Sequence, residues 1–167
     1  RERVLLPYEE LLRSVRGLGL VNSLVDDDGV FRSVLALGFA GDVALDALPV
    51  AAVRQGGLPV SVDPDGRTLR SGTRRFALDE HGRFILMPRG ATHREISFAD
   101  VWEAAQEGDR AAVSPALFRD AWVFVGSTAT GLQDDRYLTS RREMQPGVHL
   151  MAQGARHYGR LREEATA

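Results

Sequence analysis

The amino-acid sequence predicts an α/β fold of the α+β kind, in which a mixed β-sheet with a β-meander is flanked by helices. Three observations predict it. Residues 97–109 and 146–164 repeat apolar side chains with the period of an amphipathic helix. Residues 58–89 hold short β-type runs separated by turns rich in Asp and Gly. The length of 167 residues suits one domain, residues 1–167, with a sizeable core.

The N-terminal segment is expected to form a helix followed by a hairpin. Residues 6–17 carry Pro7 in the first turn and Leu11, Leu12 and Val15 on one face. The hairpin is centred on Asp28-Gly29, because this dipeptide is a strong signal for a tight turn between two strands.

A second helix and the meander come next. Asp46–Gln55 is predicted to be helical, with Asp46 as its cap and Pro49 in its first turn. The meander then uses the runs LPVSV, RRFAL and RFILM as strands, with DPDG and DEHG as the turns between them.

The third helix has the clearest signals. Ser97 and Asp100 form a capping box at its start, and Trp102 lies on its apolar face together with Phe98 and Val101. We therefore expect Trp102 to lie in the core.

A buried strand and a final helix complete the expected fold. The run AWVFVG at residues 121–126 predicts a strand with Trp122 in the core, and Pro146 opens the last helix. The apolar stripe of that helix consists of Val148, Met151, Ala152, Ala155 and Tyr158.

Composition excludes several classes of protein. The net charge of −2 provides no general attraction to nucleic acid or to anionic lipid, so no nucleic-acid partner is expected. The chain has no cysteine, which rules out disulfides, zinc–thiolate sites and thiol catalysis. No stretch has the length and apolarity of a membrane span or the pattern of a signal peptide.

The loop GSTATGLQDD at residues 126–135 is a candidate phosphate or nucleophile site. It lacks the Gly-Lys-Ser/Thr ending of a P-loop and the Gly-x-Ser-x-Gly pattern of a nucleophile elbow. We therefore interpret Ser127 and Thr128 as residues that bond their own backbone in a structural loop. The alternative is a small hydrolase that uses Ser127 or Thr128 with Asp134 and a histidine.

Neither a metal nor a cofactor is predicted. The Asp-rich segments 26–29 and 63–66, like Asp134, fit turn chemistry better than the incomplete calcium loops that they resemble. The chain has four histidines but no His-x-x-x-His pair, so a zinc site on one helix is not supported.

Three stretches of the chain match a known family pattern in order. The first matches a G-φ-v-N…D-x-D-G-φ-x-R hairpin with Asn22, Asp26, Asp28, Gly29 and Arg32. The second matches a strand and loop with Gly126, Ser127, Thr128, Ala129, Gly131 and Asp134. The third matches an M-P-G-v segment with Met144, Pro146, Gly147, Val148 and Ala152 despite the inserted Gln145. Together, and in this order, they resemble the CHASE2 family of extracytoplasmic sensor domains, and the resemblance extends from about residue 6 to residue 159.

The resemblance implies the signal-sensing domain of a bacterial transmembrane receptor, held outside the cytoplasmic membrane and coupled to a cytoplasmic cyclase or kinase. It implies no enzymatic activity in this domain, an unidentified small-molecule ligand or other stimulus, and a homodimer in the full-length receptor. Family members carry a preceding membrane helix and a further N-terminal portion. We therefore expect this chain, which starts at Arg1, to be the distal part of the domain, with its membrane helices outside it; its sheet would then be incomplete.

Residues on loops carried by a rigid sheet often bind ligands, so the two matched loops form the expected ligand-binding or interface edge. Its residues are Asn22, Asp26, Asp28, Arg32, Ser127, Thr128 and Asp134. The alternative to a sensor is a structural or dimerisation domain of the cell envelope that binds no ligand.

Overall fold

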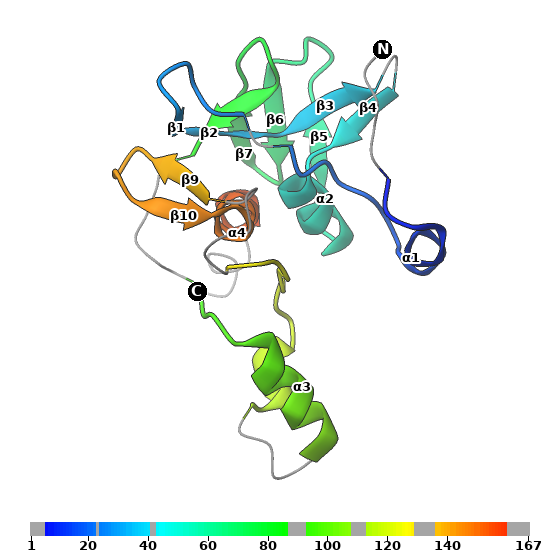
Figure 1. The fold of residues 1–167 in the computed structure, drawn as a ribbon. Coiled ribbons are helices and arrows are strands. Elements are labelled where there is room, and N and C mark those ends of the chain that lie inside the picture. The colour runs from blue at the N-terminus through cyan, green and yellow to red at the C-terminus, as the bar shows by residue number, and fades with distance from the viewer. Residues whose placement is uncertain are drawn as a thin grey trace.

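The computed structural model describes residues 6–22, 24–40, 43–86, 93–107, 113–128 and 136–159, and it shows an α+β fold (Figure 1). Its helices are α1 (Glu9–Ser14), α2 (Leu48–Gln55), α3 (Phe98–Glu107), the 3-10 helix η2 (Pro115–Phe118) and α4 (Gly147–Gly159). Its strands are β1 (Val30–Phe31), β2 (Ser33–Leu35), β3 (Leu37–Ala40), β4 (Val43–Asp46), β5 (Val60–Val62), β6 (Thr68–Ser71), β7 (Arg74–Ala77), β8 (Arg83–Ile85), β9 (Arg136–Thr139) and β10 (Met144–Pro146).

The described strands form several small sheets. Strands β5, β6 and β7 make an antiparallel meander, β3 pairs with β4, and β2 pairs with β8. Strand β9 lies between β1 and β10, parallel to β1 and antiparallel to β10. The mixed pairing confirms the predicted fold class, although the strands are divided among separate short sheets. The meander is present but is not built from the three predicted runs, because β6 was not predicted and β8, which lies in the run RFILM, pairs with β2 instead.

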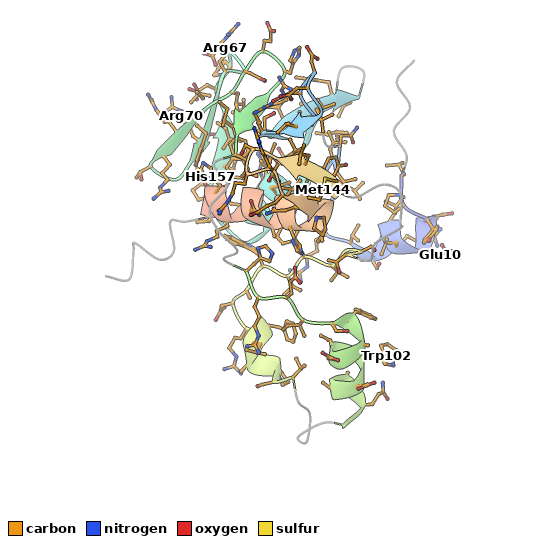
Figure 2. The ribbon with its side chains drawn as sticks, turned by 60° about the vertical axis from the view of Figure 1, so that its left-hand side comes forward. Glu10, Arg67, Arg70, Trp102, Met144 and His157 are labelled. Atoms are coloured by element: carbon orange, nitrogen blue, oxygen red, sulfur yellow. The ribbon has the colours of Figure 1, made fainter. Side chains whose placement is uncertain are left out.

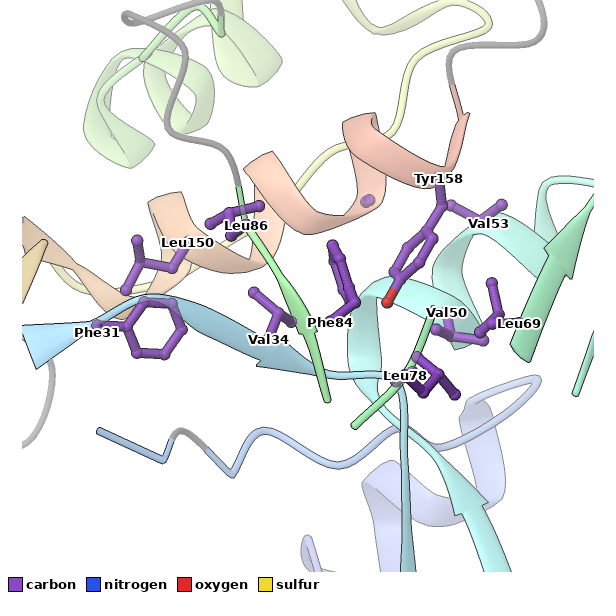
Figure 3. Close-up of a cluster of buried hydrophobic side chains, with 12 residues drawn as sticks. Phe31, Val34, Val50, Val53, Leu69, Leu78, Phe84, Leu86, Leu150 and Tyr158 are labelled. Carbon is purple, nitrogen blue, oxygen red and sulfur yellow. The ribbon is translucent and has the colours of Figure 1, made fainter. Parts of the chain in front are cut away.

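The hydrophobic core lies where α2 and α4 meet the sheets (Figure 3). Tyr158 of α4 and Phe84 of β8 bring their ring centroids to 4.6 Å, and Val50 and Leu69 are fully buried beside them. The two helices cross closely at Gly154, whose lack of a side chain permits the approach. A Cβ added there would lie only 3.1 Å from the Cγ of Pro49. Of the apolar stripe predicted for the last helix, Met151, Ala155 and Tyr158 are buried, whereas Val148 and Ala152 are half-buried. Leu150, which the prediction did not include, is also buried.

The predicted N-terminal helix is shorter than expected. It begins after Tyr8 and ends at Ser14, and none of its residues is buried. An amphipathic pattern in so short a segment does not ensure that a partner surface covers it.

The predicted hairpin is only partly correct. Gly29 has the positive φ of 77° that the turn requires, and its N–H donates to the carbonyl of Asp26. The segment before the turn forms no strand in the described residues, however, and β1 pairs with β9 from the other end of the sequence. The turn at Asp28-Gly29 depends on neighbouring residues and was predicted correctly, whereas the partner of β1 comes from a distant part of the sequence.

The N-cap of the second helix lies one residue later than predicted. Asp46 is the last residue of β4, and Ala47 is the N-cap, with no side-chain bond. Asp46 instead pairs with Arg54 at 3.2 Å, and Pro49 does lie in the first turn.

The prediction of a buried strand at residues 121–126 is wrong. The segment 121–128 belongs to no strand, and the side chains of Val123 and Val125 are exposed. Trp122 is also outside the core, where its indole Nε1 lies against Gly56.

The third helix is present, but Phe98 and Trp102 on its predicted apolar face are exposed. The Oγ of Ser97 accepts a hydrogen bond from Ala99 N–H, as expected of its cap. Trp102 is nevertheless 61% exposed, and its ring stacks on the exposed ring of Phe98. Figures 1 and 2 show α3 extending away from the sheets, with the side chain of Trp102 on its outer side.

Candidate functional site

The first group of predicted site residues meets at the turn before β1. The guanidinium of Arg32 donates to both carboxylate oxygens of Asp28, at 2.8 and 2.7 Å, and to Asp26 at 2.8 Å. The N–H of Val30 donates to Asp28 as well. The turn is therefore closed by ion pairs from within the chain, in agreement with the turn interpretation of this Asp-rich segment.

These contacts change the acidity of the turn. The hydrogen bonds from Arg32 and then from Val30 lower the pKa of Asp28 from 3.8 to about 2. The same two aspartates raise the pKa of Arg32. Arg83 approaches Asp26 from β8 at 3.8 Å, so two cations face the two carboxylates.

The second group lies along α4. A Cβ added at Gly126 would lie 2.6 Å from the Cβ of Val148, so the backbone here touches the first turn of α4. Phe124 packs on the core from this segment, while Ser127 is half-buried and Thr128 is exposed.

The structure does not bring the two groups together. In Figure 1 the turn before β1 and the segment containing Ser127 and Thr128 lie on opposite sides of α4. Asn22 is exposed on the chain leading to the turn, and Asp134 lies outside the described residues. The expected single edge is thus two separate surfaces.

A surface pocket of about 380 Å³ lies elsewhere. It lies between the β3–β4 hairpin and the turn after β5, and the paired Asp46 and Arg54 line it with Asp63. None of the predicted site residues lines this pocket.

A cluster of three potential metal ligands was not predicted from the sequence. His93 and Glu95, which precede α3, meet His149 in the first turn of α4, and one ligand-type atom from each lies within 4.8 Å of the others. The two imidazole rings are 4.7 Å apart at an angle of 64°. The local signal was His-x-Glu at positions 93–95; the long-range partner on another helix was not visible.

The electrostatics of this cluster favour neutral imidazole at His93. Burial, and after it the positive charges of His149 and Arg156, lower the pKa of His93 from 6.5, while Glu95 acts in the opposite direction. The side chain of His149 is only 18% exposed, and its Nε2 touches Oε1 of Glu95.

The other two histidines have neighbours of a different kind. His81 lies beside Glu80 at 3.7 Å on an exposed turn. His157 stacks on Phe84, with ring centroids 5.4 Å apart.

The family model described as the CHASE2 domain matches residues 3–160 of the chain. No curated protein and no solved structure matches it. In the part of the chain that the structure describes, no helix has both the length and the apolarity needed to cross a membrane.

Proposed function

Because the chain belongs to the CHASE2 family of extracellular sensor domains, we propose that it is the input domain of a bacterial transmembrane receptor. In this proposal a stimulus outside the membrane controls a cytoplasmic nucleotide cyclase or kinase in a homodimeric receptor. The observation that carries it is the family match over residues 3–160, which is nearly the whole chain. CHASE2 domains are sensors rather than catalysts, which argues against the hydrolase alternative.

Helix α4 is the element proposed to transmit the signal. Leu150 and Tyr158 are fully buried on its inner face, and it packs against both α2 and β2. A well-packed helix moves between discrete arrangements more readily than it deforms, and a ligand can shift it only by binding one arrangement better.

The two surfaces on either side of α4 are the proposed ligand-facing or interface regions. One contains Asn22 and the Asp26–Asp28–Arg32 turn, and the other contains Ser127 and Thr128. A ligand at the turn would have to compete with Asp26 and Asp28 for the guanidinium of Arg32, so an anionic group is the chemistry that fits there.

The test uses the full-length receptor in liposomes. Glu143→Cys introduces a thiol in the exposed turn before β10, the strand that leads directly into α4, and this thiol is unique in the chain because the chain has no cysteine. Spin labels attached there report the separation of the two β9–β10 hairpins that lead into α4 in a homodimer, while output activity is measured in a screen of metabolites, nucleotides and divalent ions. Glu10→Cys on exposed α1 is the matched control.

We expect at least one stimulus to change both the output and the separation at position 143, with a smaller change at position 10. An output that responds while the labels on both sites stay still would contradict transmission through α4. If no compound changes either the output or the thermal stability of the chain, the ligand-free structural domain is the better description.

The hydrolase alternative has its own test. Turnover of an ester or phosphoester substrate that Ser127→Ala abolishes without unfolding would favour it over a sensor. We expect no turnover by the unaltered chain.

A further inference from the structure

We propose that His93, Glu95 and His149 form a binding site for a divalent transition-metal ion of the zinc class. The site is independent of the receptor function proposed above, since it concerns only what these three side chains bind. Two imidazole nitrogens and one carboxylate oxygen are the ligands that zinc takes in many proteins that hold it with three side chains.

The positions of the ligand atoms fit one shared ion. All three lie within 4.8 Å of one another. Atoms bound to zinc at about 2.0–2.2 Å lie roughly 3–4 Å from each other in a tetrahedral arrangement. Oε1 of Glu95 touches Nε2 of His149, so these two atoms would have to separate to hold one ion between them, and the side chain of Glu95, which is 61% exposed, has room to rotate.

The surroundings of the His149 side chain favour a bound metal ion. Its Nε2 atom is buried and lies against Oε1 of Glu95 without the geometry of a hydrogen bond. Buried polar atoms in native proteins are paired in good geometry, and a metal ion shared with Glu95 would give this nitrogen such a bond.

The local charges set limits on affinity. Arg156 is close enough for its positive charge to act on His93, which opposes a cation, while the carboxylate of Glu95 offsets it. Three protein ligands also leave one coordination position open to water or to a small anion. A bound ion would join the segment before α3 to the first turn of α4, two regions that are far apart in the sequence.

The experiment is a titration of the chain with Zn²⁺ in which calorimetry measures the binding. The protein is used after any histidine tag has been removed. Mg²⁺ is the control ion, because it prefers oxygen ligands. Co²⁺ provides a second reading through the visible absorption of a tetrahedral complex. The variants are His93→Ala, Glu95→Gln and His149→Ala, each checked for folding by circular dichroism.

We expect one Zn²⁺ ion per chain, a rise in the unfolding temperature with Zn²⁺, and no comparable effect of Mg²⁺. Loss of an outer-shell partner typically weakens metal binding roughly 10–100-fold, so loss of a direct ligand should weaken it by at least about 10-fold. Glu95→Gln keeps the test decisive if His149→Ala fails to fold, because Glu95 is exposed.

His81→Ala is the matched control, since His81 also lies beside a glutamate but has no second histidine near it among the described residues. This variant should bind Zn²⁺ as the unaltered chain does. Absence of Zn²⁺ binding would leave only a histidine–glutamate ion pair and overturn the proposal. Binding that survives in His93→Ala and Glu95→Gln alike, or that is lost in His81→Ala, would do the same.

Discussion

At the scale of single residues, the turn before β1 depends on one arginine. Hydrogen bonds from Arg32 are the main reason why the pKa of Asp28 falls from 3.8 to about 2. A carboxyl group whose pKa is lower in the folded state contributes stability above its unfolded pKa and loses that contribution as the pH falls through the folded one. This contribution is therefore present above pH 3.8 and lost as the pH falls toward 2.

Arg32→Gln should raise the pKa of Asp28 toward 3.8, because it removes both the charge and the bidentate hydrogen bonds. An NMR titration of the Asp28 side-chain carboxyl carbon measures this shift. Arg13→Gln, which removes the exposed pair with Glu9, should leave Asp28 unchanged. A pKa of Asp28 that stays low in Arg32→Gln would show that the backbone N–H of Val30 dominates instead.

Gly126 acts through its lack of a side chain. An added Cβ would lie 2.6 Å from the Cβ of Val148, so Gly126→Ala should lower the free energy of unfolding by about 1–3 kcal/mol, the usual range for overpacking. Urea denaturation measures it. Adding Val148→Ala should relieve part of the clash, and strictly additive effects of the two substitutions would contradict the contact.

At the scale of elements, α3 and α4 differ in what covers their apolar faces. Leu150→Ala in α4 should cost about 2–5 kcal/mol, because the side chain is buried and leaves a cavity. Trp102→Ala in α3 should change stability by no more than about 0.5 kcal/mol, because most of the side chain already contacts solvent.

Equilibrium unfolding in urea compares these two variants, with circular dichroism to show that α3 still forms. If Trp102→Ala proved as costly as Leu150→Ala, the face of α3 would be packed in solution. Trp102 fluorescence in a Trp122→Phe background should accordingly have the emission of an exposed indole.

At the scale of the whole molecule, one core joins elements from both halves of the sequence. Phe31, Val50, Leu69, Phe84 and Tyr158 belong to a single buried cluster, so the elements that carry them should unfold together. Amide hydrogen exchange should then show global-unfolding protection in α2, α4 and β6, and exchange through local opening in α3. Equal protection of α3 and α4 would contradict this division.

Features that depend on residues close together in the sequence could be predicted from the sequence alone. It specified the apolar stripe of α4, the positive φ of Gly29, the turns of the meander and the cap at Ser97, since each follows from side-chain period or local hydrogen bonding. The family could also be recognised from the sequence, because the CHASE2 motifs are identified by residue types, order and spacing and need no tertiary contact.

The contacts between distant elements are seen only in the tertiary structure. It paired β1 with β9, left Trp102 and Val125 uncovered, separated the Arg32 turn from Ser127, and brought His93 to His149. Strand pairing and the burial of an apolar face depend on surfaces contributed by distant residues, and no local pattern encodes them. The same holds for a cluster of ligand atoms drawn from two elements: its residue types are visible in the sequence, but its geometry exists only once the chain has folded.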